Sequence, residues 1–280
     1  MQFEAEDGTR LFYTDSGEGT PLVLIHGWPL SSTMWEYQTN VLTERGIRCV
    51  AYDRRGFGRS DQPYSGYDYD TLASDLKQLL EHLDLQNVTL AGFSMGGGEV
   101  VRYMRNYAGA RISKIALVSS VTPCLIKTED NPDGVDKSVF EQMQFDLQVD
   151  RPSFITEFTK RFFGIGWMSS PVSDPMLAAT CEDAMKASAR ATLACVKAFS
   201  ETDFRSDLST IAVPTLVIHG DADETIPIEA SGQKSAQLIN DAQLAVYHSA
   251  PHGLFYTERA KLNGDLEELI LGKAAALSAA

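Results

Sequence analysis

The chain has 280 residues, of which 24 are Lys or Arg and 38 are Asp or Glu, so its formal net charge is −14. This acidic balance argues against nucleic acid as a partner, because binding to phosphates depends largely on clustered Lys and Arg. The hydrophobic and charged fractions, 44% and 22%, are those of a globular protein. No apolar run reaches the roughly 20 residues needed to cross a membrane, and the acidic N-terminus lacks the apolar core of a secretion signal. We therefore expect a cytoplasmic protein without a membrane partner.

The cysteines are scattered, without the close pairs that are typical of metal or redox sites, and predict reduced thiols: Cys49, Cys124, Cys181 and Cys195. His248 and His252 come nearest to ligand spacing, but they flank Pro251 and do not share a helix. The sequence therefore predicts no metal site.

Short apolar runs alternate with helical patterns, which predicts an α/β fold. Residues 2–14 form two segments around the turn pair Asp7-Gly8 and predict an antiparallel hairpin. Leucines recur at helical spacing over 72–83, after a candidate cap at Asp70. Further strands are predicted where the runs are almost continuously apolar: 21–25, 48–52, 88–92, 115–118, 214–218 and 243–247. Together these segments predict an eight-stranded, mostly parallel sheet with an N-terminal antiparallel hairpin.

The alternation stops after the sixth strand. About 95 residues separate the strands at 115–118 and 214–218, whereas a whole βαβ unit needs only about 30. Helical patterns at 139–147, 154–163 and 176–199 predict a helical cap over the carboxyl edge of the sheet. We expect a core of residues 1–120 and 205–280, a cap insertion of residues 121–204, and a frayed tail from 273 to 280.

The segment Gly92-Phe93-Ser94-Met95-Gly96 has the pattern G-x-S-x-G, directly after a strand and before a helical pattern. Ser94 would sit on a strained turn, where side chains at the two glycine positions would crowd the backbone. The pattern alone also occurs by chance, but this context favours a nucleophilic serine over a structural turn.

A serine hydroxyl needs a histidine base, which an acid holds in one tautomer. Among the histidines that follow Ser94, His219 lies at a strand end and His248 continues a strand, where a packed role is common, whereas His252 lies on a loop after the last strand. His252 is therefore the predicted base. Asp221 and Asp223 both follow the strand 214–218, and the residues alone do not choose between them.

The oxyanion hole needs two backbone N–H groups, one directly after the nucleophile and one from an early loop. Met95 supplies the first, and Trp28 is the natural second donor because Pro29 has no N–H. For His26 we favour a structural role over a catalytic one. The loop 53–60 lacks the phosphate-binding patterns, and we expect it to stabilise its own fold.

Phe154, Phe158 and Phe162 recur every four residues on a predicted cap helix. Such a stripe is usually core packing, but on a cap its buried face can also form the wall of an acyl pocket. The candidate substrate-binding residues are Pro29, Val121, Phe158, Phe162 and Phe199.

Several segments together resemble the α/β-hydrolases of the cofactor-free bacterial haloperoxidase, or arylesterase and perhydrolase, group: HGWP from His26, YDRRGFGRSDQP from Tyr52, GYDYDTLASDL from Gly66, AGFSMGGGEVVRYM from Ala91, ETDFRSDL from Glu201, PTLVIHGDADETIP from Pro214 and SAPHG from Ser249. The resemblance implies a triad of Ser94, Asp223 and His252, an oxyanion hole from Trp28 and Met95, no cofactor, and homo-oligomers, often trimers. Related dehalogenases and epoxide hydrolases carry Asp at the elbow, so Ser94 argues against both.

The expected activity is hydrolysis of small aryl or short-chain carboxylic esters. The resemblance implies that hydrogen peroxide can replace water as co-substrate, giving a peracid that oxidises halide outside the protein. Pro29 restricts Trp28, and we hypothesise that the Trp28 carbonyl accepts a hydrogen bond from peroxide. A lactonase or γ-lactamase on the same triad, and a ligand-binding receptor with this fold, are the alternatives.

Overall fold

The protein was analysed as a computed structural model that describes residues 1–167 and 169–272. The tail expected to fray, 273–280, lies outside the described residues. Of the helices within them, none is long and apolar enough to cross a membrane.

Within the described residues, eight strands form one sheet in the order β1-β2-β4-β3-β5-β6-β7-β8. The strands are β1 (Gln2–Glu4), β2 (Arg10–Ser16), β3 (Thr20–Ile25), β4 (Ile47–Tyr52), β5 (Val88–Phe93), β6 (Ile112–Val118), β7 (Thr215–Gly220) and β8 (Gln243–Tyr247). β2 pairs antiparallel with β1 and β4, and the other neighbours are parallel. The predicted sheet and its N-terminal hairpin are confirmed.

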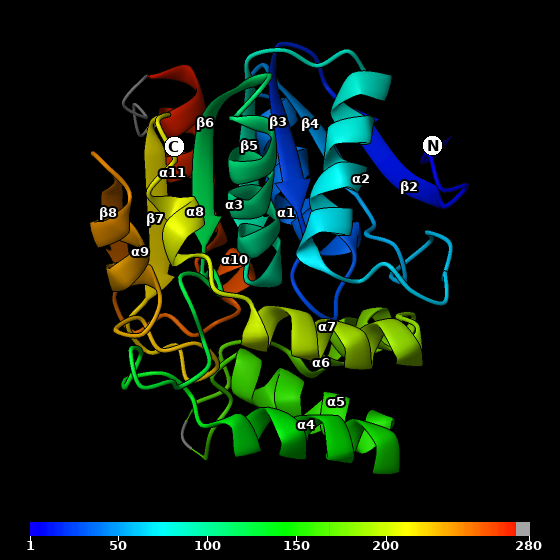
Figure 1. Ribbon diagram of the computed structural model, residues 1–280, viewed down its shortest axis with the longest axis vertical. Helices are drawn as coiled ribbons and strands as arrows, with labels where there is room; N and C mark the ends of the chain where they lie inside the picture. The colour runs from blue at the N-terminus through cyan, green and yellow to red at the C-terminus, as the bar shows by residue number, and fades with distance from the viewer. Residues whose placement is uncertain (168, 273–280) are drawn as a thin grey trace.

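Helices cover both faces of this sheet (Figure 1). The chain folds into the core elements η1 (Ser32–Trp35), α1 (Glu36–Thr43), α2 (Tyr69–His82), α3 (Met95–Tyr107), α9 (Gly232–Leu238), α10 (Leu254–Thr257) and α11 (Arg259–Leu271). α2 packs against α3, and α1 packs against α11. Every residue of β5 is buried, which explains why the central strands are apolar on both faces.

The cap of the helix after β4 lies two residues before the predicted one, and the helix begins at Tyr69. The cap is Asp68, whose side chain accepts a hydrogen bond from the Thr71 N–H at 3.0 Å. Asp70 lies in the first turn and pairs with Arg102 at 2.8 Å, so the prediction of Asp70 as the cap is wrong. Two aspartates compete here, and the long-range partner for Asp70 is invisible in the local sequence.

The insert between β6 and β7 is helical, as predicted, and Figure 1 shows its longer helices beyond the end of the sheet toward which the arrowhead of β6 points. It comprises α4 (Lys137–Val149), α5 (Arg151–Phe162), α6 (Asp174–Met185), α7 (Ala189–Glu201) and α8 (Arg205–Leu208). The single helix expected over 176–199 is two helices, because Ser188 caps a new one and accepts a hydrogen bond from the Ala191 N–H at 3.3 Å. Parallel strands end at this edge, so the insert covers the loops that follow β5, β7 and β8.

Candidate active site

Ser94 lies between β5 and α3 with φ of 53° and ψ of −117°, a region that a residue with a side chain rarely adopts. A Cβ on Gly92 would collide with the carbonyl oxygen of Gly96. A Cβ on Gly96 would lie 2.6 Å from the carbonyl oxygen of Ile25. Both glycines are therefore required for the tight turn. The turn presents the Ser94 hydroxyl at the end of a buried central strand.

Three side chains from distant loops form one hydrogen-bonded line. Ser94 Oγ lies 3.0 Å from His252 Nε2, and His252 Nδ1 lies 2.6 Å from Asp223 Oδ2. The carboxylate only accepts, so Nδ1 carries the proton and Nε2 is left to accept from the serine hydroxyl. The imidazole is 1% exposed, and its ring packs between those of Phe93 and Phe162. This arrangement orients a general base toward a nucleophile.

The structure separates the two candidate acids. Asp223 Oδ1 accepts hydrogen bonds from the N–H groups of Thr225 and Ile226 at 2.9 and 2.8 Å, while Oδ2 faces His252. Burial acts to raise the pKa of Asp223, but the neighbouring His252 and the hydrogen bonds from His219 and His252 lower it well below its usual range. The carboxyl group is therefore ionised at neutral pH.

Asp221 points away from this line, at the surface. It accepts hydrogen bonds from the Ser249 N–H and from His248 Nδ1 at 2.9 Å. The His248 side chain is 87% exposed, so the expectation of a packed residue is wrong. His248 follows the last residue of β8, and its side chain lies in solvent beside Asp221.

The early loop that begins at His26 runs directly beside the elbow, because a Cβ on Gly27 would lie 3.1 Å from that of Ser94. His26 Nε2 accepts a hydrogen bond from the Arg54 N–H at 2.9 Å, and the Arg54 guanidinium donates to the His26 carbonyl oxygen at 2.9 Å. Arg54 also forms a buried ion pair with Glu99 of α3 at 2.8 Å. These contacts give His26 the structural role that we favoured and fix the loop against α3.

The Trp28 and Met95 N–H groups have no hydrogen-bond partner among the described residues. Met95 follows Ser94 at the first position of α3, and Trp28 follows Gly27, whose Cβ position would lie 3.1 Å from Ser94 Cβ. Donors held without a protein partner beside a nucleophile are available to an oxyanion. The peptide bond between Trp28 and Pro29 is cis.

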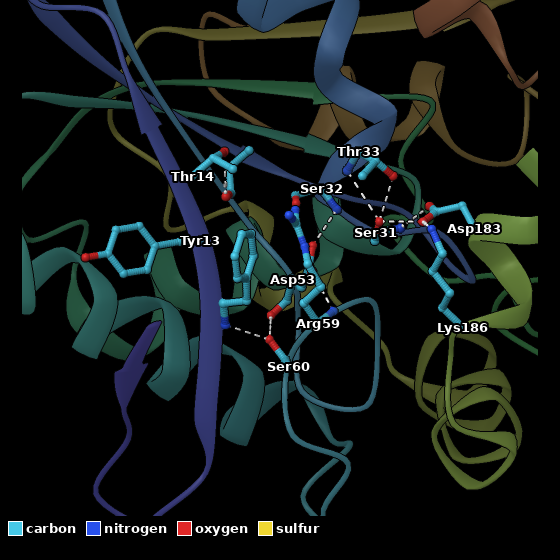
Figure 2. A network of polar contacts seen from close by, with 12 residues as sticks. Tyr13, Thr14, Ser31, Ser32, Thr33, Asp53, Arg59, Ser60, Asp183 and Lys186 are labelled. Carbon is cyan, nitrogen blue, oxygen red and sulfur yellow. Dashed lines mark hydrogen bonds and ion pairs between the residues drawn. The ribbon is translucent and has the colours of Figure 1, made fainter. Parts of the chain in front are cut away.

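The same loop is clamped between the core and the insert (Figure 2). The Ser31 N–H and hydroxyl donate to the two carboxylate oxygens of Asp183 in α6 at 2.9 and 2.7 Å. The Ser32 N–H donates to Asp53 at 2.8 Å, and the other oxygen of Asp53 accepts from the Arg59 N–H at 2.7 Å. The loop 53–60 thus stabilises its own fold, as expected, and also holds the early loop from the core side.

A cavity of about 200 Å³ opens beside Ser94 and has mostly apolar walls. Its lining residues are Trp28, Ser94, Val121, Leu125, Val135, Val139, Phe140, Met143, Phe158, Arg161, Phe199, Glu224, Thr225, Ile226 and Pro227. Three of the predicted substrate-binding residues, Val121, Phe158 and Phe199, therefore line it. Phe162 packs against His252 instead, with ring centroids 5.1 Å apart, and Pro29 lies outside the wall.

Sequence reasoning missed the polar residues that support this site from a distance. Asp183 is one, and Thr192 of α7, whose carbonyl oxygen accepts a hydrogen bond from Trp28 Nε1 at 3.0 Å, is another. His219 is the third, because its Nε2 lies 3.3 Å from Asp223 Oδ2. A histidine near the end of a mostly apolar, buried strand was the available signal for His219, whereas nothing local marks Asp183 or Thr192.

A serine elbow after a central parallel strand, with acid and base on later strand-end loops, defines the class of α/β-hydrolases. The chain matches the alpha/beta hydrolase fold family over residues 20–259. It is 46% identical over 254 residues to a putative non-heme chloroperoxidase of Synechocystis sp., covering 90% of this chain and 92% of that relative. A bifunctional esterase/perhydrolase of Acinetobacter calcoaceticus is 39% identical over 264 residues, covering 93% of this chain and 96% of that relative.

Among solved structures, the bromoperoxidase from Bacillus anthracis superposes with a TM-score of 0.93 at 46% sequence identity, over 98% of this chain and 100% of that one. The chain belongs to the alpha/beta hydrolase family and, within it, to the group of non-heme haloperoxidases and esterase/perhydrolases.

Proposed function

We propose that this protein cleaves small carboxylic esters through an acyl-enzyme on Ser94, with His252 as general base and Asp223 as its acid. The observation that carries the proposal is the line from Ser94 Oγ to His252 at 3.0 Å and on to Asp223 at 2.6 Å, beside an apolar cavity. A binding protein has no need of a strained serine aligned with a histidine. The geometry therefore favours an enzyme over a receptor.

In the first half of the reaction, Ser94 Oγ attacks the ester carbonyl carbon and His252 Nε2 takes the hydroxyl proton. The carbonyl oxygen becomes an oxyanion, for which the Trp28 and Met95 N–H groups are the proposed donors. His252 then gives its proton to the leaving alcohol as the C–O bond breaks, which leaves the acyl group on Ser94. Asp223 stabilises the imidazolium between these two transfers.

In the second half, water or hydrogen peroxide attacks the acyl carbon, and His252 takes the proton of the attacking oxygen. His252 then returns this proton to Ser94 Oγ as the bond between Oγ and the acyl carbon breaks. Water releases the carboxylic acid, and peroxide releases the peracid, which oxidises halide in solution. The Trp28 carbonyl oxygen accepts no hydrogen bond among the described residues, and we propose that it receives one from peroxide. The Acinetobacter relative is named for both activities, which supports this partition.

The cavity supports a short acyl group. Its volume is about 200 Å³, and its walls are dominated by aromatic and aliphatic side chains such as Phe158, Phe199 and Val121. Such a space fits an acetyl or small branched acyl group better than a long fatty chain.

The test compares p-nitrophenyl acetate turnover by the wild type, Ser94→Ala and Ser120→Ala. Ser120 is a matched buried serine whose hydroxyl bonds to Thr122 at 2.9 Å. Ser94→Ala is expected to lose at least about 10³-fold in kcat while Ser120→Ala retains turnover. A folded wild type that hydrolyses none of a panel of short esters and lactones would contradict the proposal.

Peroxide use is tested by acetate-dependent bromide oxidation in the same three proteins. It is expected to disappear with Ser94→Ala, because both activities pass through the same acyl-enzyme. Pro29→Leu is expected to lower the ratio of perhydrolysis to hydrolysis, and an unchanged ratio would refute the role of the Trp28 carbonyl. Homo-oligomers and a cytoplasmic location stay predictions, the first of which light scattering tests.

A further inference from the structure

His219 stands at the end of β7, four residues before Asp223, with its imidazole fully buried. Its Nε2 lies 2.9 Å from the carbonyl oxygen of Ile226 and 3.3 Å from Asp223 Oδ2. Both neighbours are acceptors, so Nε2 carries the ring proton and faces two oxygens at once. The ring is thereby fixed in one tautomer beside the triad acid.

The opposite side of the ring has no polar partner. His219 Nδ1 is buried without a hydrogen bond among the described residues, and a Cβ on Gly232 of α9 would lie 2.8 Å from it. A buried nitrogen without a partner costs free energy, so an apolar side chain would suit this place better if packing were its purpose. A role for the Nε2–H explains why an imidazole stands here.

With His219 included, Asp223 is surrounded by N–H groups. Oδ1 accepts from two backbone N–H groups, and Oδ2 lies 2.6 Å from His252 Nδ1 and 3.3 Å from His219 Nε2. The carboxylate is therefore held in one orientation, and part of the charge on Oδ2 is directed away from His252.

We propose that His219 is a positioning residue for the triad acid: its Nε2–H bonds to the Ile226 carbonyl oxygen, lies 3.3 Å from the Asp223 oxygen that faces His252, and so tunes how strongly Asp223 stabilises the imidazolium. This inference rests on the proposed function. Too strong a stabilisation would hold His252 protonated in the resting enzyme, where it can no longer accept the Ser94 proton. The nearby Nε2–H of His219 limits this stabilisation.

The charged and titratable groups around His219 and His252 can be named element by element. Asp223 is the acidic group within ion-pair distance of His219 among the described residues, and α9 presents Gly232 to the ring. His252 faces Ser94, Asp223 and the uncharged rings of Phe93 and Phe162. Asp221 is engaged with His248 at the surface, and the charged residues Arg161 and Glu224 line the cavity that opens at Ser94.

The test measures kcat and the pH profile of kcat/KM with p-nitrophenyl acetate for His219→Leu, His219→Gln and the control His248→Leu. His219→Leu is expected to move the acidic limb to higher pH, because Asp223 then stabilises the imidazolium more strongly. It is also expected to lower kcat about 10-fold, because the carboxylate is held less firmly against His252. His219→Gln, whose amide can donate from the same place, is expected to restore the limb. His248→Leu is expected to match the wild type.

A wild-type limb and kcat in folded His219→Leu would overturn the proposal. So would an equal fall in kcat for Leu and Gln with an unmoved limb, which is the behaviour of a packing residue. If His219→Leu does not fold, His219→Asn, whose amide is too short to reach Asp223, takes its place. The low-field NMR resonance of the His252 Nδ1–H reports protonation of His252 without turnover. An inactive wild type would therefore refute the proposed esterase activity and still leave this inference measurable.

Discussion

The loops at the carboxyl edge of the sheet and the helical insert above them contribute to the site in different ways. The loops after β5, β7 and β8 carry Ser94, Asp223 and His252. The tight glycine turn positions Ser94, and a backbone N–H group holds the Asp223 carboxylate that bonds to His252. The insert supplies apolar walls such as Phe158, together with a few polar ties to the core. The sheet edge thus holds the hydrogen-bonded side chains, whereas the insert forms apolar walls of the cavity and braces the early loop.

The largest loss of kcat is expected from removing the charge of Asp223 on the loop after β7. Asp223→Asn should lower kcat for p-nitrophenyl acetate by about 10⁴-fold, because the amide no longer holds His252 in the tautomer that accepts the serine proton. Asp221→Asn is the matched control and should stay within a few-fold of the wild type, since Asp221 bonds to the exposed His248. Equal losses of kcat in the two variants would mean that Asp223 has no special role in orienting His252.

The clamp from the insert should matter less, but measurably. Asp183→Ala leaves the buried Ser31 N–H and hydroxyl without their acceptor and should cost about 1–3 kcal/mol in the free energy of unfolding. Because Ser31 follows the loop that carries Trp28, kcat should fall more than KM rises. Glu182→Ala, an exposed neighbour on α6, serves as control in urea unfolding and kinetics. Wild-type kcat in Asp183→Ala would show that the early loop does not depend on the insert.

Selectivity should change when a wall of the cavity is removed. The ring of Phe158 packs against Trp28 with centroids 5.2 Å apart, so Phe158→Ala enlarges the cavity beside Ser94. The ratio of kcat/KM for p-nitrophenyl hexanoate to that for the acetate should rise about tenfold. Phe145→Ala on α4 is the control, because that side chain is 59% exposed. An unchanged ratio in Phe158→Ala would place the acyl group elsewhere.

The smallest expected effect concerns a charge pair of the core far from the chemistry. Burial acts to raise the pKa of Asp7, but the hydrogen bonds from Arg55 and Thr9 lower it from its usual 3.8 to about 2. A lowered carboxyl pKa stabilises the fold above about pH 3.8, and this contribution is lost as the pH falls toward 2. Asp7→Asn should therefore lower Tm slightly at pH 7.

The difference in Tm between Asp7→Asn and the wild type should shrink as the pH falls from 3.8 to 2 and vanish below pH 2, where both side chains are uncharged. Glu6→Gln, at an exposed neighbouring position, should follow the wild type throughout. A constant difference across the pH range would show that Asp7 acts through its turn geometry rather than through its charge.

The strands and the elbow could be predicted because their signals are local. A run of apolar residues between turn residues specifies a buried strand, and the glycines around Ser94 are needed for the turn itself. Helix boundaries were less certain, since Asp68 and Asp70 compete as caps and Ser188 interrupts what looked like one helix. In each case the deciding contact is a single hydrogen bond, which a pattern of apolar spacing does not encode.

By itself the sequence determined the sheet, the serine turn and the loops on which a base and an acid must stand, because these follow from periodicity, glycine sterics and chain order. Only the tertiary structure decided that Asp223 rather than Asp221 faces His252, that Phe158 lines the cavity while Phe162 packs on the imidazole, and that Asp183 and His219 support the site. The physical reason is that hydrogen bonds and side-chain packing between segments far apart in the chain depend on ångström-scale positions, which exist only once the sheet and its insert have packed together.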